Sequence, residues 1–171
     1  TFSYSPIREV DGSVAGMLCV VSEDTDRVIS DRRLTTLRDL GAALAATATE
    51  DDVHRVVRTC LQAHQADLPF ALLYQLDDDG TARLVSASGL PDGHPAAPAT
   101  IDPATSVIWP IAGVLDGETV IVDDLDRRLD GPVPSEVWDD PTRAAVLVPL
   151  AQQGQAEPAG FLVAGLNPYR A

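Results

Sequence analysis

Two segments in the last third of the chain are apolar at consecutive positions rather than at alternate ones. They span residues 144–150 and 159–166. A strand with one solvated face alternates apolar and polar side chains, whereas a strand covered on both faces is apolar throughout. We therefore expect these two segments to be central strands of a sheet, with helices or loops on both sides.

The rest of the chain divides into shorter apolar runs separated by turn residues. Asp11-Gly12 and Asp78-Asp79-Gly80 are turn signals, because glycine accepts the positive φ that tight turns need. Further strands are predicted at 2–8, 13–21, 70–76, 82–87 and 119–122, helices at 25–48, 49–68 and 106–115, and loops at 89–103 and 125–142. This order predicts an α+β domain in which helices flank an antiparallel sheet, preceded by a β-hairpin.

The segment that follows Thr49 has the pattern of an amphipathic helix. Thr49 and Asp52 are spaced as a capping box, and acidic residues suit the positive end of a helix. Leu68-Pro69 marks the predicted end. The apolar face of this helix comprises Val53, Val56, Val57, Cys60, Leu61 and His64.

The predicted helix at 25–48 carries a second apolar line, formed by Leu34, Leu37, Gly41, Leu44 and Ala48. Spacings of three and four residues are typical of a coiled-coil seam, but this one lasts only about two heptads. Two interpretations remain open from the residues alone. The helix packs on its own domain, or it forms a dimer and transmits a signal.

The charge balance excludes several classes of function. The chain has 26 acidic residues against 12 basic ones, a formal net charge of −14. Such a chain repels nucleic acid and anionic lipid surfaces. No apolar run reaches the roughly 20 residues that span a bilayer. Cys19 and Cys60 lie in apolar runs and resemble reduced, structural cysteines, so we expect a cytoplasmic protein.

Residues 30–166 resemble a GAF domain. The similarity is carried by Leu37-Arg38-Asp39-Leu40, by Leu68-Pro69-Phe70-Ala71-Leu72-Leu73-Tyr74, by Gly117-Glu118-Thr119-Val120-Ile121-Val122-Asp123 and, most closely, by Val146-Leu147-Val148-Pro149-Leu150 with Gly160-Phe161-Leu162. Residues 1–24 resemble the last two strands of a PAS domain, through Phe2-Ser3-Tyr4-Ser5-Pro6-Ile7, Asp11-Gly12 and Gly16-Met17-Leu18-Cys19-Val20-Val21.

These resemblances imply a signal-input module of a longer bacterial protein, a sensor histidine kinase or a PP2C-type phosphatase. The implied organisation is a PAS tail at 1–24, a connecting helix at 25–48 and a GAF domain at 49–171. GAF domains usually end in a helix that pairs with the first one, and none follows residue 166. We therefore expect the seam of the first helix to find another partner, a second copy of the chain, and to form a homodimer.

Ligand-binding candidates follow from the segments that cover the pocket of a GAF domain. Trp109 and Trp138 fall in those segments, where they either line a pocket or fill it as loop anchors. Asp123 begins the long loop, and Tyr74 and Arg143 complete the set of residues expected to contact an unidentified small molecule. A ligand site combines flat apolar walls with a few polar groups.

No residue set supports catalysis or a resident cofactor. His54, His64 and His94 are not spaced as zinc ligands, and His54 is expected to be exposed. No cysteine follows Cys60, so neither bilin attachment nor the cysteine cycle of GAF-type methionine sulfoxide reductases is expected. We predict a non-enzymatic module without a cofactor. The alternative is a non-covalent haem or flavin sensor that uses His94.

Overall fold

The computed structural model describes residues 2–150 and 157–169. The chain divides into two compact units, Thr1–Arg38 and Asp39–Ala171, and the boundary lies inside helix α1 (Thr25–Leu44). Among the described residues, no helix is long and apolar enough to cross a membrane.

The first unit contains the predicted hairpin, β1 (Phe2–Arg8) and β2 (Val14–Val21), followed by most of α1. At the turn, the Glu9 N–H donates to the Ser13 carbonyl, and Gly12 has φ +87°. The Asp11 carboxylate accepts hydrogen bonds from the backbone N–H and the hydroxyl of Ser13. All residues of the two strands are exposed except Gly16, which is half-buried.

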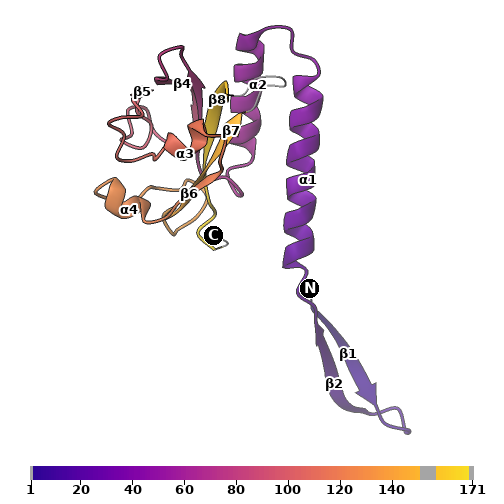
Figure 1. The fold of residues 1–171 in the computed structure, drawn as a ribbon. Helices are drawn as coiled ribbons and strands as arrows, with labels where there is room; N and C mark the ends of the chain where they lie inside the picture. Colours follow the sequence, from indigo (N-terminus) through magenta and orange to yellow (C-terminus); the bar gives the residue numbers. More distant parts are fainter. Residues whose placement is uncertain (1, 151–156, 170–171) are drawn as a thin grey trace. The chain divides into compact units, whose positions relative to one another are not determined.

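The second unit is built on a six-stranded antiparallel sheet with strand order β5-β4-β3-β8-β7-β6 (Figure 1). The strands are β3 (Ala71–Leu76), β4 (Ala82–Ser88), β5 (Thr100–Ile101), β6 (Val120–Val122), β7 (Ala145–Leu150) and β8 (Gly160–Gly165). The two segments that are apolar at consecutive positions, 144–150 and 159–166, form β7 and β8. These strands lie side by side in the interior of the sheet, as predicted.

The two faces of this sheet are covered to different extents. On the face that we call the core face, Leu72, Tyr74, Leu147, Phe161 and Val163 are fully buried. The segments between β4 and β7 cover it with Ala96, Trp109, Ile111, Val114, Leu125 and Val133. On the opposite face, called the α2 face, Val146 and Val148 are half-buried and Leu150 is 39% exposed. The prediction that these strands are covered on both faces is therefore confirmed for the core face, whereas the α2 face is only partly covered.

Helix α2 (Glu50–Ala63) begins at the predicted cap. The Thr49 hydroxyl accepts from the Asp52 N–H at 3.2 Å and donates to the Asp52 carboxylate at 2.9 Å. The helix ends before the predicted 68, because His64 bonds back to the Leu61 carbonyl and a tighter turn runs to Leu68. Pro69 then prevents any return to a helix.

Helix α1 also ends earlier than predicted, at Leu44 rather than at 48. The Thr47 hydroxyl and N–H both donate to the Leu44 carbonyl and tighten the last turn. The predicted helix at 106–115 shortens to α3 (Ala112–Leu115), because Pro110 has no N–H to donate. The predicted loops contain two further elements, β5 and α4 (Leu125–Arg128).

Candidate functional site

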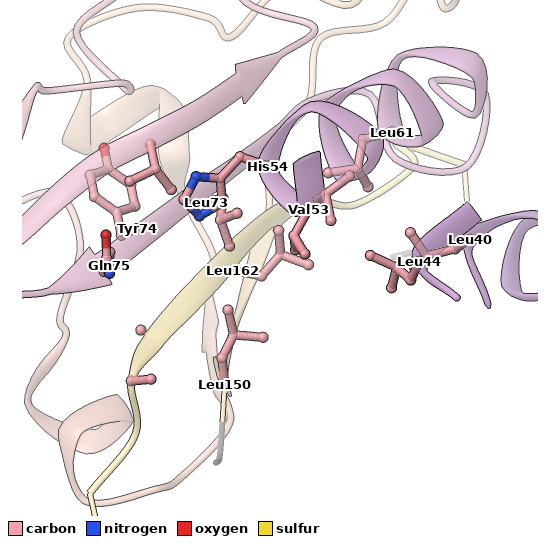
Figure 2. A pocket seen from close by; sticks show the side chains of 14 residues that line it. Leu40, Leu44, Val53, His54, Leu61, Leu73, Tyr74, Gln75, Leu150 and Leu162 are labelled. Atoms are coloured by element: carbon pink, nitrogen blue, oxygen red, sulfur yellow. The ribbon is translucent and has the colours of Figure 1, made fainter. Parts of the chain in front are cut away.

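An apolar cavity of about 400 Å³ lies within the second unit, between α2, the end of α1 and the α2 face of the sheet (Figure 2). Its lining residues come from helix α1 (Leu40, Leu44), helix α2 (Val53, His54, Val57, Leu61) and the sheet (Leu73, Tyr74, Gln75, Val85, Leu150, Ala159, Gly160, Leu162). This volume falls within the range of small-molecule pockets. The sheet is therefore loosely packed on the side where α2 and the end of α1 lie.

The cavity brings together aliphatic side chains and very few polar ones. His54 and Gln75 supply an imidazole and an amide at one side of it (Figure 2). The Gln75 side-chain oxygen accepts from the Arg83 guanidinium at 3.3 Å. His54 is half-buried here, so the expectation that it is exposed is wrong. Such a surface accommodates apolar groups, and its described lining residues place no nucleophile beside a base.

Two of the five predicted ligand-binding residues lie in the closed core. The Tyr74 ring stacks on Phe161 with centroids 5.1 Å apart, and its hydroxyl donates to the Pro98 carbonyl at 2.9 Å. Burial raises the pKa of this hydroxyl. The Trp109 indole N–H donates to the Ala96 carbonyl at 2.8 Å, and the side chain is fully buried. Both rings fill the space over the core face themselves.

The other three predicted residues lie at the surface of the second unit. Asp123 and Arg143 are exposed. Trp138 is half-buried, and its indole N–H donates to the Ala66 carbonyl at 3.1 Å. Of all five, Tyr74 also borders the cavity, which lies across the sheet from Trp109. The structure thus groups Tyr74 with Trp109 in the core and leaves Asp123, Trp138 and Arg143 in separate surroundings.

Groups that hold cofactors or metals are sparse in the part of the chain that the structure describes. No three His, Cys, Asp or Glu side chains there gather into a metal site. The His94 Nδ1 accepts from the Ala96 N–H at 3.1 Å, so this ring stabilises its own loop. Cys60 is half-buried on α2, and burial, then the charge of Asp39, raises the pKa of its thiol. Cys19 is exposed in the first unit.

The cavity was not predicted from the sequence, although some of its lining was. The apolar face of α2 predicts that Val53, Val57 and Leu61 pack against the sheet. The non-alternating pattern of 144–150 and 159–166 predicts apolar side chains on the α2 face. No pattern in the sequence indicates that space remains between these surfaces.

Several solved structures have a fold similar to that of this chain. Neither the protein-family models nor the curated proteins give a match. The GAF domain of an Acinetobacter phosphoenolpyruvate-protein phosphotransferase is 13% identical, with a TM-score of 0.57, over 82% of this chain and 80% of that one. The phycoerythrobilin-bound GAF domain of a cyanobacterial phytochrome is 17% identical, with a TM-score of 0.52, over 80% and 82%.

A third similar structure is fRMsr of Staphylococcus aureus, solved with its substrate. It is 13% identical, with a TM-score of 0.56, over 78% of each chain. At such identities the likeness shows the fold alone. The fold of this chain is accordingly a GAF-like α+β fold with an additional N-terminal hairpin.

Proposed function

From this GAF-like fold we propose that the chain is a non-enzymatic sensory input domain of a multidomain bacterial signalling protein, with a sensor histidine kinase as the parent that we favour. The GAF domains among the similar structures come from a phosphotransferase and a phytochrome, which supports a regulatory role. The second unit has a single cysteine, Cys60, whereas catalysis through a disulfide cycle needs two cysteines. This favours a non-enzymatic domain.

The proposed mechanism is a rearrangement of helix α1. Leu40 and Leu44, near its end, are half-buried and border the cavity rather than a filled core. Close-packed interiors resist displacement, whereas a helix that borders a 400 Å³ space has room to move. A signal that favours one position of α1 shifts the population of that position. The cavity beside α1 is the observation that carries this proposal.

The proposed output is a change in a homodimer that α1 forms with a second copy. Leu34 and Leu37 are 62% and 66% exposed, although both belong to the predicted seam. Burying a leucine contributes roughly 1.5–3 kcal/mol, and a two-fold interface buries each residue twice. When the α1 helices of two copies move together, a change in their crossing angle or helical register can be transmitted to an output domain.

The experiment compares the solution mass of the wild-type chain with that of a Leu34→Glu, Leu37→Glu variant, at concentrations up to about 100 µM. We expect a dimer for the wild type and a monomer for the variant, with the same circular dichroism spectrum. Val107→Glu is the matched control, because Val107 is 78% exposed and lies outside α1. It should remain dimeric. A wild-type monomer, or a variant that still dimerises, would overturn the proposal.

A ligand that drives the rearrangement remains part of the proposal and is a small, largely apolar molecule. Tyr74, Trp109, Asp123, Trp138 and Arg143 remain the residues proposed to contact a ligand; Tyr74 and Trp109 lie in the core, and the other three lie at the surface of the second unit. Because Tyr74 and Trp109 are closed in, a ligand there must displace the loops that cover them. Ligand binding should then raise the melting temperature of the chain, and screening by thermal shift measures that effect.

A further inference from the structure

Three segments that are distant in the sequence meet at one backbone carbonyl. The Ala66 carbonyl, in the connection between α2 and β3, accepts from the Trp138 indole N–H at 3.1 Å. It also accepts from the Asn167 side-chain amide at 2.9 Å. Trp138 belongs to the loop at 129–142, and Asn167 to the segment that follows β8. The Ala66 carbonyl therefore connects the loop at 129–142 with the segment that follows β8.

The same loop and segment also contact each other directly. The Trp138 and Tyr169 rings pack edge to face, with centroids 5.4 Å apart and planes at 68°. The Asp140 carboxylate beside the Tyr169 hydroxyl raises the pKa of that hydroxyl, and the charge of Asp139 adds to the effect. Aromatic rings favour this edge-to-face arrangement, because the positive edge of one ring meets the negative face of the other.

Each partner is oriented for these contacts by its own backbone. The Ser135 hydroxyl accepts from the Trp138 N–H at 3.1 Å, which fixes the turn that presents the indole. The Asn167 side-chain oxygen accepts from the Tyr169 N–H at 2.9 Å, while its amide reaches Ala66. Asn167 thus positions Tyr169 and binds Ala66 at the same time.

The other end of the loop is anchored in the core. Val133 is fully buried, and its carbonyl accepts from the Thr142 N–H at 3.0 Å. Leu125, in α4 just before the loop, is also fully buried among the residues that cover the core face. A displacement of the covering loops on the core side therefore moves the backbone that carries Trp138.

We infer that Trp138, Asn167 and Tyr169 form a latch that couples the loop at 129–142 to the segment leaving β8. In the closed state both donors hold the Ala66 carbonyl and the rings are in contact. In the open state Trp138 leaves Ala66, and the 167–169 segment is released with it. The coupling is reciprocal, so a change in the direction of the departing chain also opens the loop. Its role in signalling rests on the proposed function.

The test measures backbone amide exchange by NMR in Trp138→Phe, which keeps a ring and removes the indole N–H. Losing one net hydrogen bond of about 1 kcal/mol corresponds to roughly fivefold faster exchange. We expect that increase at Tyr169, outside the loop that carries the substitution. Trp109→Phe is the control, because it removes an indole bond to a different carbonyl, that of Ala96. Unchanged exchange at Tyr169 in Trp138→Phe, or an equal increase in Trp109→Phe, would refute the latch.

A second measurement tests the latch by substituting Asn167 and Tyr169, in the segment that follows β8. The chain has two tryptophans, so Trp109→Phe leaves Trp138 as the sole tryptophan, whose emission can be excited selectively over that of tyrosine. Adding Asn167→Ala or Tyr169→Ala should shift its emission to longer wavelengths as the indole becomes solvated. An unshifted spectrum would also refute the latch. Both measurements concern one protomer, so a failure of the proposed dimer leaves their outcome unchanged.

Discussion

At the scale of single residues, Gly160 shows how closely two central strands approach. A methyl group at this position would overlap the Tyr74 carbonyl oxygen, which belongs to the backbone of β3 and cannot turn aside. We expect Gly160→Ala to lower the free energy of unfolding by about 2 kcal/mol, as overpacking does. Gly131→Ala is the control, because nothing lies within 4 Å of its added methyl group. Urea denaturation measures both, and equal stabilities would contradict the tight β3–β8 contact.

Two adjacent residues of β7 distinguish the two faces of the sheet. Leu147 is fully buried on the core face, whereas Val148 is half-buried on the α2 face. An aspartate at 147 would bury an unpaired charge, so Leu147→Asp should abolish the folded state. Val148→Asp should leave a folded, destabilised protein whose aspartate reaches solvent. Circular dichroism at 25 °C separates these outcomes. Equal loss of structure in both variants would mean that the α2 face is as closed as the core face.

At the scale of elements, the start of α2 depends on Thr49. Replacing this cap by alanine should cost about 1 kcal/mol of unfolding free energy, while Thr49→Ser keeps the hydroxyl and should cost little. The hydrogen bond with the Thr49 hydroxyl, and then Arg55, hold the pKa of the Asp52 carboxyl below its ordinary value of 3.8. A carboxyl with a lowered pKa stabilises the fold above its unfolded pKa and loses that effect as the pH falls through the folded value.

The pH dependence checks this assignment of the cap. The difference between wild type and Thr49→Ala should be largest at neutral pH and should shrink below pH 3.8, as Asp52 becomes protonated. Denaturation curves at pH 7 and pH 3 measure it. A difference that stays constant between these pH values would show that the carboxylate takes no part in the cap.

The elements also differ in how far the sequence predicts them. Consecutive apolar residues predicted that β7 and β8 lie inside the sheet, and a 3.6-residue period predicted α2. A four-residue helix such as α4 has no periodicity, and it begins after Asp124 with a left-handed φ of 60°. The cavity and the half-buried His54 escaped prediction because both depend on how closely α1, α2 and the sheet approach one another. Side-chain pattern specifies which faces are apolar, not how much space they enclose.

At the scale of the whole molecule, charge and apolar surface are distributed unequally along the chain. The first unit contains six acidic and five basic residues, so nearly all of the net charge of −14 belongs to the second unit. The repulsion between two acidic second units opposes their close contact. The nearly neutral helix α1, with Leu34 and Leu37 exposed, is therefore a segment where two copies can meet at a low electrostatic cost.

The central claim is that α1 pairs with α1 of a second copy through the seam. Cross-linking tests it most directly, in a background without native cysteines (Cys19→Ser, Cys60→Ala), with a single new cysteine on α1. Gly41→Cys lies on the seam and should form an intermolecular disulfide rapidly on mild oxidation. Asp39→Cys, on another side of the same helix, should do so far more slowly. Equal cross-linking at both positions, or none at Gly41→Cys, would contradict the account.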